Sequence, residues 1–236
     1  MTKGNKKKTA NIIIDLSMVV LMPLLMAYSL IGEEFHEIIG TLIFILFIVH
    51  HILHLKWWKA IPRGKYNAYR ISITVFNIIL LIVMFLQPLS GIALSKHIYT
   101  FLQLKGVAAT ARTIHIICAY WCYVLLSLHL GLHTDQIIQP LKSKKSFAKM
   151  KWIGRAVFIL IAAYGIYAFI HRGFWGYMSG KTMFAFFDFS ESRVLFIVDY
   201  LAVMTLFAVI GNYLSKLLKF RRKTKSQIAI ASCNNF

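Results

Sequence analysis

Long apolar stretches separated by short polar connections make up almost the whole chain. Six of them have roughly the 20 residues that a helix needs to cross a bilayer. We expect these spans at about residues 11–32, 35–55, 71–95, 113–133, 153–171 and 194–214. The connections are too short to hold a soluble domain. The pattern therefore predicts an all-α membrane protein with six transmembrane helices, a basic N-terminus (1–10) and a basic tail (215–236).

Lysine and arginine are concentrated in alternate connections. Their numbers there are four at the N-terminus, five in Lys56–Arg70, six in Lys142–Arg155 and six in Lys216–Lys225, whereas the opposite connections hold six in all. Cytoplasmic connections of membrane proteins are enriched in these residues. We therefore expect a multi-pass protein of the plasma membrane with both termini in the cytoplasm.

Composition argues against several other classes of protein. The chain is 58% hydrophobic, with a mean hydropathy of +0.66, which is too apolar for a soluble domain. The net charge of +19 would suit nucleic acid, but the basic residues lie at the ends of spans, so we expect no nucleic-acid partner. Lys3–Lys8 before an apolar run imitates a signal peptide. Because the run is long and no small-residue cleavage site follows, we expect an uncleaved first span.

Six of the nine histidines follow one spacing that occurs twice. His36 is followed by His50 and His54 after 14 and 18 residues, and His115 by His129 and His133 after the same intervals. Histidine is costly inside a membrane and usually marks a function there. Both segments are expected to run from outside to inside, which brings His36 to His115 at the outer depth. It likewise brings His50 to His129 at the inner depth, and each imidazole pair can fill both axial positions of one haem iron.

The inner side offers two choices of ligand. Fourteen residues of helix rise about 21 Å and return to within about 40° of the starting direction. Eighteen residues are also in phase, but they rise about 27 Å, close to the edge of a hydrocarbon core of about 30 Å. The spacing therefore favours His50 and His129 over His54 and His133, which stay open as the alternative pair.

The other polar residues of the spans have ordinary interpretations. We expect His97 and His171 to be interfacial residues at helix ends, and His51 to point away from the face that carries His36 and His50. Asp15 and Asp199 are acids near the ends of spans. Helix-end solvation is the expected role of both, with a proton relay or a quinone contact as the alternative.

Three motifs resemble the flavinylation-associated cytochromes, a family of small multispan membrane proteins. They are the H-x3-G…H pattern in 36–50, the stretch SGIALSKHIYTFL at 90–102, and SLHLGLH at 127–133. The resemblance is densest over about 33–135. It implies a four-helix haem-binding core within 11–135, two haem b groups and axial ligands at His36, His50, His115 and His129. It also implies electron transfer between membrane carriers and an extracytoplasmic, covalently flavinylated partner, with 153–214 as two further helices.

These observations predict a di-haem b-type cytochrome that passes electrons across the bilayer. The expected donor is quinol or a cytoplasmic-side reductant. One alternative is a quinone-linked oxidoreductase subunit. Another is a metal-ion transporter or sensor that uses the histidines directly. Transporter sites usually lie near the bilayer midplane on broken helices, whereas the middle of the second span, 41–49, is apolar and unbroken. The aromatic outer connection Gly173–Arg193 is expected either to dock the partner or to lie in the membrane interface.

Overall fold

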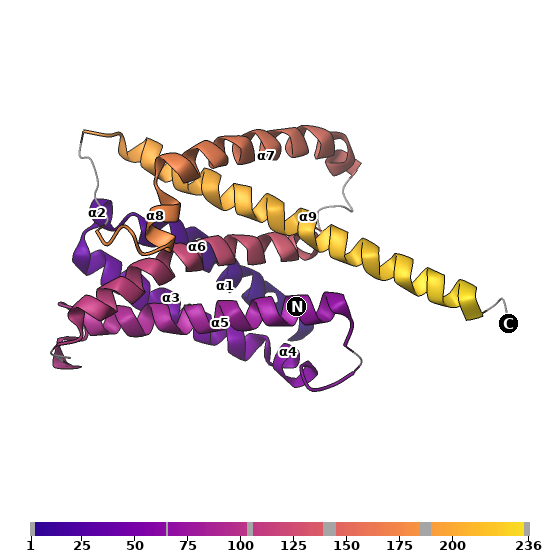
Figure 1. Cartoon of the computed structure of the whole chain (residues 1–236), viewed down its shortest axis with the longest axis horizontal. Helices are drawn as coiled ribbons and strands as arrows, with labels where there is room; N and C mark the ends of the chain where they lie inside the picture. Colours follow the sequence, from indigo (N-terminus) through magenta and orange to yellow (C-terminus); the bar gives the residue numbers. More distant parts are fainter. Residues whose placement is uncertain (1–2, 65, 103–105, 139–144, 185–189, 234–236) are drawn as a thin grey trace.

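The computed structural model describes residues 3–64, 66–102, 106–138, 145–184 and 190–233, and these form helices without a strand (Figure 1). The helices are α1 (Lys3–Met26), α2 (Tyr28–Ile31), α3 (Glu33–Leu53), α4 (Leu55–Ala60), α5 (Ala68–Leu94), η1 (Thr100–Leu102), α6 (Ala108–Ile138), α7 (Lys145–His171), α8 (Phe174–Met178) and α9 (Arg193–Cys233). Six of them are long and apolar enough to cross a membrane, namely α1, α3, α5, α6, α7 and α9. The predicted fold class is therefore confirmed.

The first expected span, 11–32, is divided in the structure. α1 ends at Met26, and the single turn of α2 follows it before the chain reverses into α3. Gly32 lies at this reversal with φ +84°, a left-handed conformation that glycine adopts without steric cost. The apolar stretch thus includes the turn between two antiparallel helices, which hydropathy alone does not reveal.

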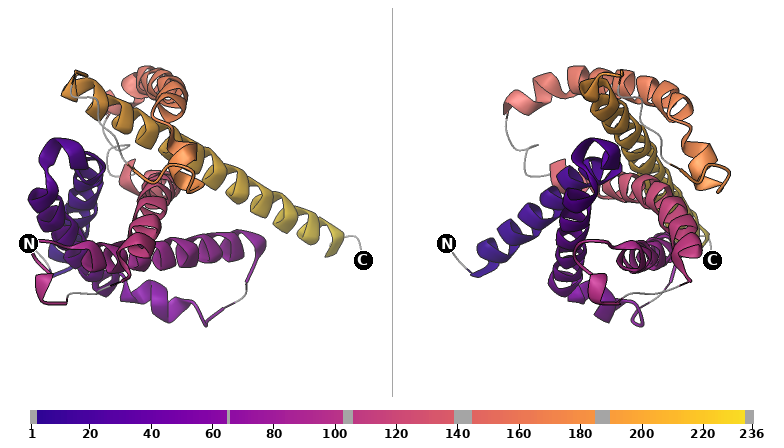
Figure 2. Two further views of the ribbon diagram at one scale, coloured as in Figure 1. Left: turned by 60° about the vertical axis from the view of Figure 1, so that its left-hand side comes forward. Right: turned by 90° about the vertical axis from the view of Figure 1, so that its left-hand side faces the viewer.

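α6 is the central helix of the molecule. It packs directly against α5 on one side and α9 on the other, while α1 packs on α3 and α7 packs on α9. Its membrane-crossing segment is 44% buried, compared with 11% to 33% for the other five. Viewed end-on, α1, α3, α5 and α6 form one group of helices, and α7 and α9 lie along one side of this group (Figure 2).

Glycines allow α6 and α9 to pack backbone against backbone. A Cβ added at Gly131 would lie 2.1 Å from the Ala208 carbonyl oxygen, and one added at Gly211 would lie 2.3 Å from that of Leu128. Small residues at helix contacts are the usual means of close approach inside membranes. The contact fixes α9, and through it α7, against the helix that carries His115 and His129.

Replacing Gly131 with valine is therefore expected to destabilise the protein by several kcal/mol, since overpacking against a rigid backbone oxygen forces the helices apart. Thermal unfolding in detergent measures this effect. Gly154→Ala is the matched control, because a Cβ at Gly154 meets nothing within 4 Å. An equal loss of stability in both variants would contradict the account of the α6–α9 contact.

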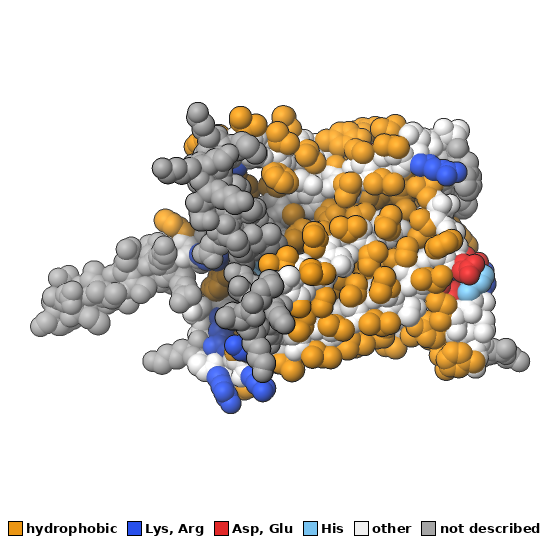
Figure 3. Space-filling view, turned by 180° about the vertical axis from the view of Figure 1, so that it is seen from behind, with side chains coloured by type: hydrophobic (Ala, Val, Ile, Leu, Met, Phe, Trp, Pro, Cys, Tyr) orange, Lys and Arg blue, Asp and Glu red, His pale blue; other side chains and the backbone are white. Residues whose placement is uncertain are grey.

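An apolar belt covers the sides of the molecule. Large exposed side chains such as Ile45, Ile79, Leu160 and Leu201 lie along α3, α5, α7 and α9. Figure 3 shows such side chains spread between the two ends on one face, with Lys and Arg gathered mainly at one end. Exposed apolar surface of this extent is expected of a protein solvated by lipid.

A buried polar group joins α7 to α9. The Asp199 carboxylate is only 3% exposed, and it accepts hydrogen bonds from Tyr164 at 2.5 Å and from Arg172 at 2.8 Å. Arg172 also donates to Glu191 at 2.7 Å. The expectation that Asp199 is solvated at a helix end is therefore wrong. A buried carboxylate requires paired partners, and Arg172 and Tyr164 provide them.

Candidate functional site

His36 on α3 and His115 on α6 meet at the end of the helices that carries the α5–α6 connection. We call this end the outer end because the charge pattern predicts that it faces outside, and we call the opposite end the inner end. Their ring centroids are 6.1 Å apart and the ring planes are inclined by 72°. α3 and α6 are separated by one antiparallel span, α5, so they run in the same direction. The structure thus brings together the two residues that the repeated spacing pairs at the outer depth.

Three residues of α5 hold the His115 ring. Gly91 has no side chain, and a Cβ there would lie 3.1 Å from His115 Cε1. The Gln87 carbonyl oxygen and Ser90 Oγ both lie 3.2 Å from His115 Nδ1, and Gln87 Nε2 lies 3.2 Å from His115 Nε2. Donation from Nδ1–H to the Gln87 carbonyl leaves Nε2 as an acceptor. In this tautomer Nε2 accepts a hydrogen bond from the Gln87 amide, so a metal at Nε2 would take the place of that amide donor. A carbonyl bonded to the other ring nitrogen commonly orients a histidine ligand.

The four remaining spaced histidines gather near the inner end. The rings of His50 and His54 are 4.4 Å apart by centroid, and those of His129 and His133 are 4.6 Å apart. His129 is also close enough to His50 and His54 for their charges to interact. The structure brings all four together, and their arrangement by itself favours neither inner pair.

Asp15 of α1 adds a carboxylate to this inner group. Its Oδ1 lies 2.7 Å from His50 Nδ1, and one ligand atom from each of Asp15, His50 and His54 lies within 4.8 Å of the others. The Asp15 side chain is 46% exposed, so this contact does not exclude the expected helix-end solvation, which stays a prediction. Its depth on the first span, close to that of His50, is the only sequence signal for this contact, and it does not specify which way the side chain points.

The other histidines and the outer connection have separate environments. His97 Nε2 lies 4.0 Å from Glu33 at the outer surface, and the His171 ring stacks on Tyr167 at 5.3 Å. Within Gly173–Arg193, Phe174 is fully buried in the hydrophobic core, and residues 185–189 lie outside the described part of the chain. α8 buries Phe174 but leaves Trp175 62% exposed, so docking of a partner and a place in the membrane interface both stay predictions for this connection.

The residues at both depths fit a flat group held between α3 and α6. Buried ring nitrogens of His36 and His129, Nδ1 in each case, have no hydrogen-bond partner among the described residues. Such atoms are costly unless something binds them. Over the described residues the α3 and α6 backbones barely approach each other, although α1 and α3, and α5 and α6, pack directly. At the level of His36 and His115, imidazoles from the two helices meet across this space, which suits a metal centre with a ligand from each side.

Comparison with protein families agrees with this geometry. A family model described as prokaryotic cytochrome b561 matches residues 9–152, more than half of the chain. The chain belongs to the prokaryotic cytochrome b561 family. It is therefore a membrane b-type cytochrome that transfers electrons across the membrane with haem b as its cofactor, which confirms the prediction at this level. Searches of curated proteins and of solved structures gave no significant match.

The matched region of this b561-family cytochrome holds α1, α3, α5 and α6, and with them all six spaced histidines. α8 and α9 lie beyond it, as does most of α7. Membership of the flavinylation-associated group stays a prediction.

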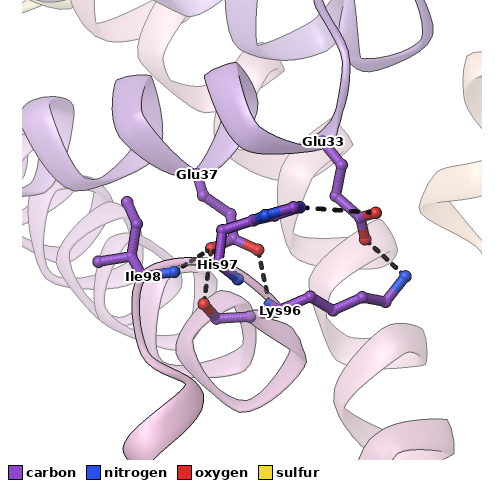
Figure 4. A network of polar contacts seen from close by, with 6 residues as sticks. Glu33, Glu37, Lys96, His97 and Ile98 are labelled. Atoms are coloured by element: carbon purple, nitrogen blue, oxygen red, sulfur yellow. Dashed lines mark hydrogen bonds and ion pairs between the residues drawn. The ribbon is translucent and has the colours of Figure 1, made fainter.

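In this cytochrome, a carboxylate next to His36 fixes the outer end of α3. Glu37 accepts hydrogen bonds from Ser95 Oγ at 2.6 Å and from the backbone N–H groups of Lys96, His97 and Ile98 at 2.7, 3.2 and 2.9 Å (Figure 4). This ties α3 to the loop that follows α5, and so holds His36 near the α5 residues that contact His115.

A salt bridge extends the same network outward. Lys96 Nζ lies 2.7 Å from Glu33, and the hydrogen bond to that carboxylate raises the pKa of Lys96 above its ordinary value. Both side chains are substantially exposed, so the pair adds little stability by itself.

Replacing Glu37 with alanine is expected to cost about 1–2 kcal/mol of stability, because water can replace only part of the four lost hydrogen bonds. Hydrogen exchange at the amides of Lys96, His97 and Ile98 should become faster. Glu34→Gln is the control, since Glu34 is exposed and its exchange pattern should match the parent protein. Unchanged exchange at the three amides in Glu37→Ala would disprove the role of this carboxylate.

Proposed function

We propose that the cytochrome holds two haem b groups, one ligated by His36 and His115 and one by His50 and His129. The observation that carries the proposal is the 6.1 Å approach of the His36 and His115 rings from two helices that run in parallel. The repeated 14-residue interval then implies a second pair at the inner depth. Bis-imidazole ligation fills both axial positions of the iron, which suits electron transfer rather than oxygen binding.

Asp15 supports His50 as the inner ligand on α3. A carboxylate bonded to one ring nitrogen fixes the orientation of the ring and leaves the other nitrogen for a metal. On α6, the buried Nδ1 of His129 supports His129 as its counterpart. His54 and His133, one turn further along each helix, form the alternative pair.

The two proposed ligand pairs would hold the haems at two depths, so that electrons cross the membrane in steps. Bound haem supplies reversible one-electron chemistry, and the protein tunes it through axial ligands and burial. The 14-residue interval separates the ligands by about 21 Å along the helix axis, which divides the bilayer crossing into shorter steps. Gln87, Ser90 and Gly91 hold the outer imidazole, and Asp15 holds the inner one.

We further propose that electrons pass from quinol or a cytoplasmic-side donor to an extracytoplasmic, flavinylated partner. The excess of Lys and Arg in alternate connections supports placing both termini in the cytoplasm, and thus His36 and His115 on the outer side of the plasma membrane. The described residues contain no flavin domain, so the flavin would belong to the partner. The chain is then an electron-transfer protein or a subunit of a larger oxidoreductase.

One observation favours a different class of function. The ligand atoms of Asp15, His50 and His54 are close enough together to hold a metal ion directly. A metal-ion transporter or sensor would use such a group. The family match and the outer histidine pair, which the metal hypothesis leaves unused, both favour the cytochrome.

Electron transfer across a sealed membrane tests the proposed function. Proteoliposomes that contain trapped ferricyanide should lose its absorbance when ascorbate is added outside, and His115→Ala should abolish most of the protein-dependent rate. Protein-free vesicles give the background. If the rate stays at background while the same vesicles accumulate zinc, the transporter hypothesis replaces the cytochrome mechanism.

A further inference from the structure

The two proposed ligand pairs differ in the group that contacts Nδ1 of an imidazole. At the inner pair, His50 Nδ1 lies 2.7 Å from a carboxylate oxygen of Asp15. At the outer pair, His115 Nδ1 lies 3.2 Å from the neutral Gln87 carbonyl oxygen and 3.2 Å from Ser90 Oγ. The inner contact is the shorter one, as expected of a hydrogen bond that a charged acceptor strengthens.

The Asp15 carboxylate acts on the inner group without a paired cation. It is close enough to His129 for its charge to act on that ring as well. Among the residues that the structure describes, no Lys or Arg forms an ion pair with Asp15. Lys56 and Lys59 lie on α4 at the same end, but both are exposed, so solvent and salt screen their charges. The inner pair therefore lies beside an anion that is not neutralised.

The outer pair has no such partner, although Glu37 follows His36 in the chain. Glu37 accepts hydrogen bonds from Ser95 Oγ and three backbone N–H groups, which take up its charge, and it acts on His36 only through space. Nδ1 of His36 has no hydrogen-bond partner in the described part of the chain. Neither outer imidazole is therefore bonded to a carboxylate.

This difference has a definite electronic consequence. An imidazole whose N–H is bonded to a carboxylate becomes more electron-rich, and its other nitrogen becomes a more basic ligand. A stronger donor and a nearby negative charge both favour the oxidised iron, which lowers the reduction potential. The neutral carbonyl at His115 has a weaker effect of the same kind. Because Asp15 is 46% exposed, solvent screens part of its charge and moderates the difference.

We propose that Asp15 is a positioning residue that directs electron transfer outward, by holding the inner haem at a lower reduction potential than the outer haem. This rests on the proposed function, with His50 as an inner ligand. An electron that passes from the inner to the outer iron oxidises the first and reduces the second, without a change in bonds or protons. The proposed cytoplasmic-side reductant supplies that electron. The unequal hydrogen bonds on His50 and His115 make the step downhill.

A spectroscopic redox titration of the haem-loaded protein tests this order of potentials. Two one-electron components are expected, and His115→Ala should remove the one with the higher potential. In that background a single inner component remains, so the effect of Asp15→Asn can be measured on it alone. Asparagine keeps the size and a hydrogen-bond acceptor but loses the charge. It should favour reduction of the inner haem about tenfold, which is about 59 mV for a one-electron couple.

Two further variants separate the charge from the contact. Asp15→Glu keeps the carboxylate and should stay within about threefold of the parent protein. Glu34→Gln removes an exposed acid at the outer end and should shift neither component. Haem content and the low-spin spectrum, measured on the same samples, should not change in Asp15→Asn. A shift in potential with both unchanged reports the charge, because a purely structural role would alter ligation instead.

The possible outcomes are distinct. The proposal is overturned if His115→Ala removes the component with the lower potential. It is also overturned if Asp15→Asn shifts the inner component less than about threefold or makes it harder to reduce. If Asp15→Asn fails to hold the inner haem, the order of the two components in the parent protein decides. A parent protein without haem would instead contradict the proposed function.

Discussion

Replacing His115 with alanine is expected to lower the haem content from two per chain to one. The His115 ring lies 6.1 Å from that of His36 and is held by three residues of α5, so its loss removes one of two proposed axial ligands from a defined position. A pyridine haemochrome assay against protein concentration measures the ratio. The remaining haem should still be reduced by dithionite, because the inner histidines are one 14-residue interval away.

A matched control for this variant is His97→Ala. His97 also lies near the outer end, but its side chain is 43% exposed and faces Glu33 rather than α6. Its replacement should leave two haems. Loss of both haems in His115→Ala, or of neither, would contradict the outer ligand pair.

The second large effect concerns the choice between inner histidines. His50→Ala is expected to remove the inner haem and His54→Ala to retain it, because Asp15 holds His50 Nδ1 and thereby directs its other nitrogen. Haem content and the redox titration of each variant decide between them. In His50→Ala the outer component of the titration should remain.

The reverse result would assign the inner site to the alternative pair. If His54→Ala loses a haem and His50→Ala does not, then His54 is the ligand and the Asp15–His50 pair has another role. His129→Ala and His133→Ala repeat the comparison on α6, where His129 is expected to be essential for the inner haem.

Much of this architecture follows from simple sequence patterns. Apolar length predicts the six spans, and the alternation of Lys and Arg gives them a direction. Helices separated by one antiparallel span run in parallel. The repeated 14-residue interval therefore places the histidines of the second and fourth spans at the same two depths. The approach of His36 to His115 follows from these rules without any knowledge of side-chain packing.

Contacts that depend on helix rotation could not be predicted in the same way. Hydropathy does not specify which face of α1 turns toward α3, so the Asp15–His50 contact requires the three-dimensional structure. The pairing of Asp199 with Arg172 requires α7 and α9 to pack together, and their sequences contain no charge pattern that signals it. The reversal from α2 into α3 uses the positive φ of Gly32, one small residue at the end of a continuous apolar stretch.

The helices beyond the family match also contribute to the core. Tyr123 Oη on α6 donates to the Tyr200 carbonyl oxygen on α9 at 2.6 Å, which adds to the backbone packing around Gly131. α9 therefore restrains the helix that carries His115 and His129. A direct contact of α7 or α9 with haem is not needed for this role.

The most direct test of the central claim is the cofactor content of the purified parent protein. Haem quantification, an absorption spectrum before and after dithionite, and elemental analysis are carried out on the same sample. We expect a red protein with two haem b groups per chain, a Soret band that shifts on reduction, and iron matching haem. A colourless protein that carries zinc or manganese would contradict it.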